Sequence, residues 1–156
     1  MTERSATHAI FTIERTYDVP PARVFAAFST KAQKDRWFSR SSDWTLLKHE
    51  FDFSVGGIER LSGLWPSGMA SHFDCRYQDI VPNERIVYVY NMTLDERLIS
   101  ISLATLEFKP ARSGTLLVLT EQGVYLDGFE DGGGREHGTR FLLDKLGAAL
   151  QGEADA

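Results

Sequence analysis

Apolar and polar positions alternate along most of the chain, and this pattern predicts extended strands. Residues 8–17, HAIFTIERTY, separate into two sets of alternate positions, one of which contains Phe11 and Ile13. A period of two is typical of a strand, whose successive side chains face opposite sides of a sheet. The pattern recurs in six further segments: residues 44–53, 58–65, 71–81, 84–93, 97–109 and 115–122.

Short turns join most of these segments, which favours antiparallel neighbours. Pro82-Asn83 and Ser113-Gly114 are two such turns. Gly56-Gly57 lies between residues 44–53 and 58–65 and raises the question of a phosphate-binding loop. Such a loop needs a following helix, whereas the alternation resumes at Ile58. The pair is therefore predicted to be the apex of a hairpin, where glycine adopts a positive φ without steric cost.

Helical spacing occurs in two places. After the first strand and Pro20-Pro21, the spacing of Val24, Phe25 and Phe28 predicts a short helix, and a second short helix is predicted to end near residues 37–38. Near the end of the chain, five apolar residues fall on one face of a long helix: Leu142, Leu143, Leu146, Ala149 and Leu150. Such a helix must bury its apolar face.

The predicted order is one strand, two short helices, six strands and one long helix. This favours an α+β fold in which a curved antiparallel sheet of six to seven strands wraps around the long C-terminal helix. An internal cavity is expected where sheet and helix separate. Residues 1–156 are interpreted as one domain, with flexible ends at 1–7 and 151–156.

Composition and charge exclude several classes of partner. The chain has 156 residues, of which 42% are hydrophobic and 25% charged, as in an ordinary globular domain. The net charge of −5 argues against a general nucleic-acid binder. No apolar stretch approaches the roughly 20 residues of a membrane span, and no signal peptide is recognisable. The single cysteine, Cys75, excludes an intramolecular disulfide, and a cytoplasmic location is expected.

Several phrases resemble one known family. They are VPPARVFAAFST, RWF, FDFSVGG, YQDIVPNERIVYVY, SGTLLVLTEQG and GTRFLLDKLGAAL, and they span about residues 10–150. Their order and spacing resemble the activator of Hsp90 ATPase homologue-like branch of the START/Bet v 1-like (SRPBCC) superfamily, which has the helix-grip fold. Members commonly have Gly-Trp where this chain has Gly138-Thr139, so the cavity is expected to be larger or reshaped there.

The resemblance implies a hydrophobic pocket that binds a lipid-, polyketide- or flavonoid-like molecule. Some members are cyclases or aromatases, and one eukaryotic branch acts as an Hsp90 co-chaperone. The fold hosts many functions, so activity must be argued from the site. The small apolar ligand is the expected partner, no cofactor or metal is expected, and a homodimer through an exposed aromatic or strand edge stays open.

Aromatic residues dominate the predicted ligand-binding set, because tyrosine and tryptophan carry polar groups that need partners in a cavity. Alternation places Tyr88, Tyr90 and Met92 on one face of their strand, and Phe73 and Tyr77 on one face of theirs. The predicted ligand-binding residues are Trp37, Phe38, Phe53, Ile58, Trp65, Phe73, Tyr88, Tyr90, Met92, Leu103, Leu119, Leu142 and Leu146.

No recognisable motif identifies a catalytic residue. GxSxG, HExxH and metal-ligand spacings are absent from the sequence. Glu107, Glu121, Tyr88 and His137 are the candidates for acid–base chemistry if they face the cavity. Cys75 is expected to be a buried, inert thiol, and His72 and Asp74 are expected to lie on the outer face of their strand. The glycine run 132–134 is interpreted as a flexible connection that gates the cavity.

Overall fold

The computed structural model describes residues 4–38, 43–129 and 133–154. Its elements are β1 (Ala6–Tyr17), α1 (Pro21–Ser29), α2 (Lys31–Lys34), β2 (Thr45–Phe51), β3 (Ile58–Leu64), β4 (Ala70–Val81), β5 (Arg85–Leu94), β6 (Arg97–Ala111), β7 (Gly114–Leu126) and α3 (Gly133–Ala154). This confirms the predicted order of elements. Of the predicted glycine gate, Gly132 lies outside the described residues, and Gly133 and Gly134 begin α3.

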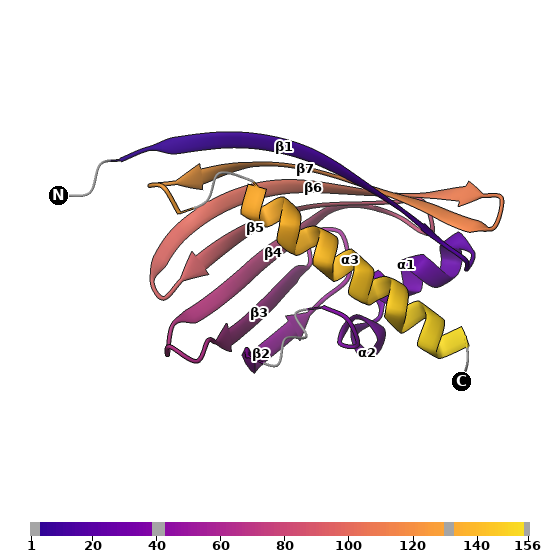
Figure 1. Ribbon diagram of the computed structural model, residues 1–156, viewed down its shortest axis with the longest axis horizontal. Coiled ribbons are helices and arrows are strands. Elements are labelled where there is room, and N and C mark those ends of the chain that lie inside the picture. Colours follow the sequence, from indigo (N-terminus) through magenta and orange to yellow (C-terminus); the bar gives the residue numbers. More distant parts are fainter. Residues whose placement is uncertain (1–3, 39–42, 130–132, 155–156) are drawn as a thin grey trace.

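The strands form one antiparallel sheet in the order β1-β7-β6-β5-β4-β3-β2. Consecutive strands pair as hairpins from β2 to β7, and β1 pairs with β7. The sheet curves around α3, which crosses its concave side, while α1 and α2 lie at one end of the helix (Figure 1). The helix-grip fold predicted from the sequence is confirmed. None of the described helices is long and apolar enough to cross a membrane.

Strand register assigns each residue to the concave or the convex face. The cross-strand row Glu121, Ala104, Tyr88 and Tyr77 belongs to the concave face, where Glu121 and Ala104 are buried. In the next row along the strands, the side chains point to the opposite, convex face. This row contains Ile10, Gln122, Leu103, Val89, Arg76 and Ile58, and Ile10 is 69% exposed.

Helix α3 is fixed to the sheet through β1. Leu143 and Leu146 are buried in the core, and Tyr17 Oη donates a hydrogen bond of 2.8 Å to the Leu143 carbonyl oxygen. Gly147 faces the Tyr17 ring so closely that a Cβ there would lie 3.2 Å from a ring carbon. The C-terminal half of α3 therefore packs at a defined height above the sheet.

The Gly56-Gly57 pair forms the β2–β3 hairpin, as predicted, and also pairs with β4. Gly56 has φ +83°, and its amide donates to the Tyr77 carbonyl oxygen at 2.8 Å. The Tyr77 amide donates in turn to the Gly57 carbonyl oxygen at 3.0 Å. The hairpin apex thereby fixes the backbone of Tyr77 in β4.

Candidate ligand-binding site

A continuous band of aromatic rings covers part of the concave face. We call it the ring band, and it consists of Phe38, Phe73, Tyr90, Tyr88 and Tyr77. Successive ring centroids are 5.4, 4.9, 5.9 and 5.9 Å apart. These are separations at which aromatic pairs attract beyond simple burial. The band joins the end of the α2 region to the centre of the sheet.

The ring band is only partly covered. Its members Phe38, Phe73 and Tyr88 keep some solvent exposure, as do Met92 of β5 and Leu142 of α3, although all five pack against the core. Large apolar side chains that face the inside of a fold and still have accessible surface are typical of the wall of a ligand site. The concave face therefore offers an apolar, aromatic surface on both the sheet side and the helix side.

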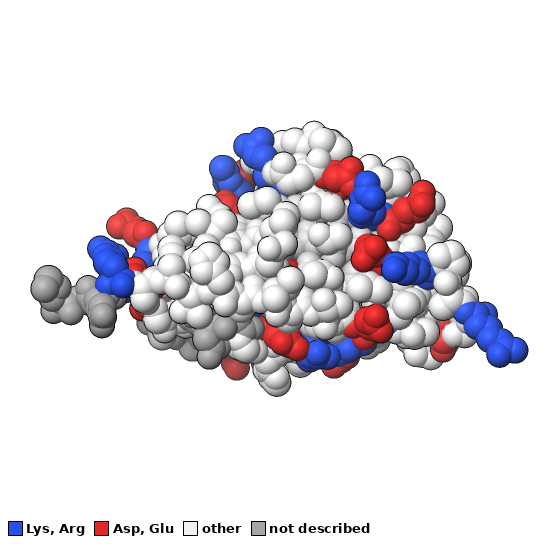
Figure 2. Space-filling model, turned by 90° about the horizontal axis from the view of Figure 1, so that it is seen from above, with Lys and Arg blue, Asp and Glu red and all other residues white. Residues whose placement is uncertain are grey.

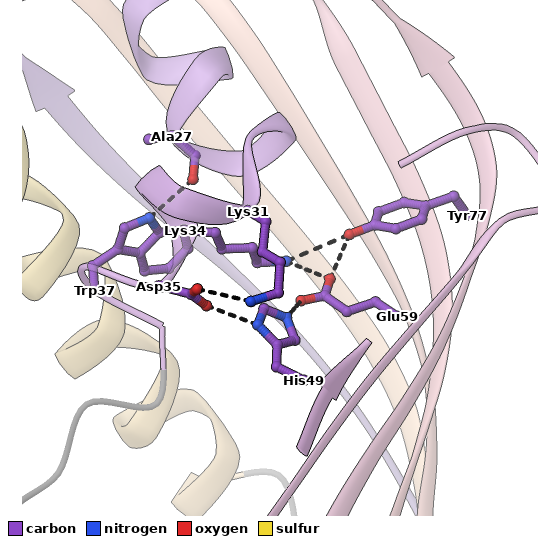
Figure 3. A network of polar contacts seen from close by, with 8 residues as sticks. All are labelled: Ala27, Lys31, Lys34, Asp35, Trp37, His49, Glu59 and Tyr77. Atoms are coloured by element: carbon purple, nitrogen blue, oxygen red, sulfur yellow. Dashed lines mark hydrogen bonds and ion pairs between the residues drawn. The ribbon is translucent and has the colours of Figure 1, made fainter. Parts of the chain in front are cut away.

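A buried polar cluster lies at one end of the ring band. We call it the Glu59 network, and it contains Lys34, Asp35, His49, Glu59 and Tyr77 (Figure 3). Glu59 Oε1 accepts hydrogen bonds from Lys34 Nζ at 2.6 Å and from Tyr77 Oη at 2.5 Å. Glu59 is fully buried and Lys34 is 6% exposed. A buried carboxylate is tolerated in this way, because it is both paired and hydrogen-bonded.

The charge of Glu59 is fixed by these contacts. Burial alone raises the pKa of a carboxyl group, but the Lys34 charge and the hydrogen bonds from His49, Lys34 and Tyr77 outweigh it and lower the pKa of Glu59 to about 2. Burial and the adjacent Glu59 carboxylate raise the pKa of the Tyr77 phenol. Glu59 is thus an ionised acceptor, and Tyr77 a neutral donor, near neutral pH.

His49 joins two carboxylates across the network. Its Nε2 lies 2.8 Å from Glu59 Oε2 and its Nδ1 lies 2.7 Å from Asp35 Oδ1. An ionised carboxylate only accepts hydrogen bonds, so this geometry is satisfied by an imidazolium that donates from both nitrogens. Although its own burial raises the pKa of Asp35, the hydrogen bonds from Lys31 and His49 have the larger combined effect and lower it. The residues that follow α1 are thereby tied to β2 and β3.

A second polar cluster lies on the other side of the ring band, below the first turn of α3. We call it the Glu121 network, and it contains Tyr90, Ser100, Ser102, Glu121 and Arg135. Tyr90 Oη donates to Glu121 Oε2 at 2.7 Å. Arg135 Nη1 donates to Tyr90 Oη at 2.9 Å, and Arg135 Nη2 donates to Ser100 Oγ at 2.8 Å. These contacts hold the start of α3 against β5 and β6.

Tyr88 lies between the two networks. It is the cross-strand neighbour of Tyr77, and its ring centroid lies 5.9 Å from that of Tyr90. Unlike the Tyr77 and Tyr90 hydroxyls, its hydroxyl makes no hydrogen bond with any residue that the structure describes. Burial, followed by the charge of Glu121, raises its pKa well above 10, so the phenol is a neutral donor.

Ten of the thirteen predicted ligand-binding residues lie inside the fold. Phe38, Phe53, Phe73, Tyr88, Met92 and Leu142 are partly exposed there, and Trp37, Tyr90, Leu119 and Leu146 are buried. Leu103 and Ile58 instead lie on the convex face, in the row of Val89 and Arg76. Trp65 is 41% exposed at the end of the β3–β4 hairpin. These three residues do not share the concave surface.

The acid–base candidates separate in the same way. Glu121 is buried on the concave face, whereas Glu107 pairs across the sheet with Val118 and Arg85 on the convex face. The two carboxylates therefore do not face each other. His137 is exposed on α3.

The other residues singled out in the sequence have contacts that support the structure. His72 accepts or donates a hydrogen bond of 2.8 Å with Ser62 on the convex face, and Asp74 forms an ion pair with Arg60. Cys75 is buried, and burial raises the pKa of its thiol to about 12. None of the residues that the structure describes form a group of three or more His, Cys, Asp or Glu placed to hold a metal ion.

Sequence reasoning missed Lys34, His49, Glu59 and Arg135. One signal was available for Glu59, because it alternates in phase with Leu61, and Leu61 is buried. No local pattern pairs Lys34 with Glu59, since 25 residues separate them. The same holds for Arg135 and Tyr90, because 45 residues separate them.

The convex face carries a hollow of its own. A groove of about 570 Å³ lies over β1, β7, β6 and β5, and its lining includes Ile10, Val89, Ile101, Leu103 and Val124. Seen from the β1 side, the middle of the molecular surface carries few charged side chains (Figure 2). The groove is separated from the ring band by the thickness of the sheet.

Comparison with known proteins assigns the chain to a family. The model of the family described as "Activator of Hsp90 ATPase homolog 1-like protein" matches residues 18–151. The chain belongs to this family. The family has the SRPBCC, or Bet v 1-like, fold, which generally binds hydrophobic ligands. The resemblance inferred from the sequence is therefore confirmed.

Solved structures to which the chain is similar agree with the fold. The chain is 45% identical to a protein from Rhizobium leguminosarum, with 96% of this chain and 99% of that chain covered and a TM-score of 0.91. A protein from Rhizobium loti, Mll3558, is 43% identical over 93% and 99% of the two chains, with a TM-score of 0.86. An AHSA1-like protein from Aeromonas hydrophila, at 16% identity over 94% of each chain and a TM-score of 0.70, shares the fold. None of the curated proteins compared with the chain matches it.

Proposed function

We propose that this member of the family binds a small apolar or aromatic molecule between the concave face of the sheet and α3. The observation that carries the proposal is the ring band, in which Phe38, Phe73 and Tyr88 keep accessible surface while packing against the core. Apolar walls with a few placed polar groups are typical of small-molecule sites. Lipid-, polyketide- and flavonoid-like molecules all have the required apolar area.

The methionines give a direct test by NMR. The chain contains three methionines, so methyl labelling yields a sparse spectrum. Met92 lies on the concave face beside the ring band, and Met69 is 40% exposed in the β3–β4 turn. Titration with flavonoids, fatty acids and polycyclic ketones is expected to shift the Met92 methyl signal and to leave that of Met69 in place.

A pair of neighbouring substitutions on α3 distinguishes the site from surface binding. Leu142→Trp fills space on the side of α3 that packs against the core, whereas Phe141→Trp adds an indole where Phe141 is 58% exposed. Binding is expected to fall at least tenfold in the first variant and to stay unchanged in the second. Equal effects of the two substitutions, or no Met92 shift with any probe, contradict the proposal.

Two other functions use the same fold. A cyclase- or aromatase-like catalyst retains Tyr88 and Glu121 as concave-face candidates, and turnover of a bound polyketide that Tyr88→Phe abolishes would favour it. The family description names Hsp90 ATPase activation, and an unchanged Hsp90 ATPase rate in the presence of this protein removes that function. The ring band favours ligand binding over both.

A further inference from the structure

Tyr88 differs from three other tyrosines of the concave face, Tyr17, Tyr77 and Tyr90, in its hydrogen bonding. Tyr77 Oη donates to Glu59 at 2.5 Å, Tyr90 Oη donates to Glu121 at 2.7 Å, and Tyr17 Oη donates to a backbone carbonyl at 2.8 Å. No residue within the described ranges bonds the Tyr88 hydroxyl. Because inward-facing hydroxyls normally have a partner, this donor is available to a molecule that enters the site.

The carboxylates on either side of Tyr88 already have other hydrogen-bond partners. Glu59 Oε1 already accepts from Lys34 and Tyr77, and Glu59 Oε2 contacts His49. On the other side, Glu121 Oε2 accepts from Tyr90. Two satisfied networks therefore flank one hydroxyl that has no partner among the described residues.

The cations of the two networks are also occupied. Lys34 Nζ contacts Glu59 at 2.6 Å and lies 4.5 Å from the centroid of the Phe38 ring. Arg135 donates to Tyr90 and Ser100 and lies over the Tyr90 ring. A ligand carboxylate beside Tyr88 would have to compete for these cations and would meet the charges of Glu59 and Glu121. An anionic head group is therefore disfavoured at this position.

We propose that Tyr88 is the hydrogen-bond donor that positions the ligand, and that the ligand is a neutral molecule with a carbonyl or comparable acceptor on an apolar, ring-bearing body. This inference rests on the function proposed above and specifies its ligand class. The rings of Phe73 and Tyr90 supply the edges and faces against which an aromatic body packs. The raised pKa of Tyr88 keeps the phenol protonated, so it donates to the acceptor over the whole physiological range.

Three matched probes test the ligand class: 2-acetylnaphthalene, 2-ethylnaphthalene and 2-naphthoate. They share one ring system and differ in the presence of a neutral acceptor, no acceptor or an anion. Affinities are measured from the Met92 methyl shift in the wild type, in Tyr88→Phe and in Tyr17→Phe. Tyr17→Phe is the matched control, because it removes an inward-facing hydroxyl that is bonded to α3.

The ratio of ketone to hydrocarbon affinity is expected to be about three- to tenfold higher in the wild type and in Tyr17→Phe than in Tyr88→Phe, as one net hydrogen bond predicts. The naphthoate is expected to bind more weakly than the ketone. A ratio that Tyr88→Phe leaves unchanged, or a preference for the naphthoate, overturns the proposal. The infrared carbonyl stretch of bound 2-acetylnaphthalene gives a second readout in the wild type alone. A shift to lower frequency on binding is expected, and a carbonyl frequency typical of an apolar solvent overturns the proposal even if Tyr88→Phe fails to fold.

The failures of the two proposals are distinguishable. If the probes shift the Met92 signal but Tyr88→Phe leaves the ratio of their affinities unchanged, the ligand class is wrong and the binding site stands. If no probe in this set or in the wider panel shifts Met92, the proposed function is wrong and the ligand class falls with it.

Discussion

Lys34 Nζ lies 2.6 Å from Glu59 Oε1 in the interior of the protein, and this contact ties α2 to β3. The pair lies at the end of the ring band, where Tyr77 Oη bonds the same carboxylate oxygen. The contact has two expected consequences: a polar cluster bounds one end of the ring band, and the stability of that end depends on one buried carboxylate.

Glu59→Gln is expected to destabilise the protein by about 3–5 kcal/mol, because it leaves the buried Lys34 charge without a partner. The free energy of unfolding is measured by urea denaturation. Glu50→Gln is the control, since Glu50 pairs with Lys48 and Arg60 at the surface, and this substitution is expected to change stability much less than Glu59→Gln. A loss below about 1 kcal/mol in Glu59→Gln contradicts a structural role for the pair.

The double variant Lys34→Met/Glu59→Gln isolates the coupling between the two residues. Removing both charges leaves no unpaired cation in the core, so the double variant is expected to be more stable than Glu59→Gln alone. If the losses of the two single variants simply add, the charges do not interact as the 2.6 Å distance implies.

Acid titration tests the charge state of Glu59. Its pKa is about 2 in the folded protein, below its ordinary value of 4.5, so its contribution to stability is full above about pH 4.5 and is lost as the pH falls toward 2. The shift corresponds to about 3 kcal/mol. The stability difference between wild type and Glu59→Gln is therefore expected to shrink over this window, and a difference that is constant from pH 5 to pH 2 contradicts the lowered pKa.

Arg135→Met is expected to loosen the start of α3. The substitution removes the donor to Tyr90 and Ser100 and leaves the Glu121 charge less compensated, at a cost of about 2–5 kcal/mol. Hydrogen exchange is expected to accelerate most in the first turns of α3. Arg140→Met removes a surface pair with Glu136 on the same helix and is expected to cost about 0.5 kcal/mol or less.

The Trp44 ring packs directly against Gly63 and leaves no room for a larger residue there. A Cβ at position 63 would lie 2.1 Å from the Trp44 ring, whose Nε1 donates to Ser71 Oγ at 2.9 Å. Gly63→Ala is expected to cost about 1–3 kcal/mol through displacement of the ring and to shift the tryptophan fluorescence. Gly138→Ala is the control, since a Cβ there meets nothing within 4 Å, and the helix is expected to gain up to about 1 kcal/mol. Unchanged stability and fluorescence in Gly63→Ala contradict this packing.

Hydrophobic periodicity predicted the fold because each strand buries one face, yet it misassigned faces where both faces are apolar. In β6, Ile101 and Leu103 form an apolar alternation, but the concave set begins with Ser100 and Ser102, which bond Arg135. In β3, Ile58 is apolar and convex, while Glu59 is charged and concave. Polar residues fill inward positions there because they have partners from α2 and α3.

Those partners explain the limit of the sequence prediction. Alternation reports the environment within one strand, and it carries no information on a residue such as Lys34 that reaches the same position from another element. The ring band was predictable because its members are aromatic and because its four strand residues, in β4 and β5, alternate in phase with the buried Cys75 and Ile86. The Glu59 and Glu121 networks, which lie at its two sides, could be recognised only from the three-dimensional structure, because they join residues of different elements.

We expect the ligand to occupy the concave face beside Tyr88 and not the groove on the convex face. Nuclear Overhauser contacts between 2-acetylnaphthalene and the methyl groups of the protein test this directly. Contacts with the methyl groups of Met92 and Leu142 are predicted. Contacts with Ile10, Ile101 and Leu103 in their place would put the ligand in the convex groove and contradict binding beside Tyr88.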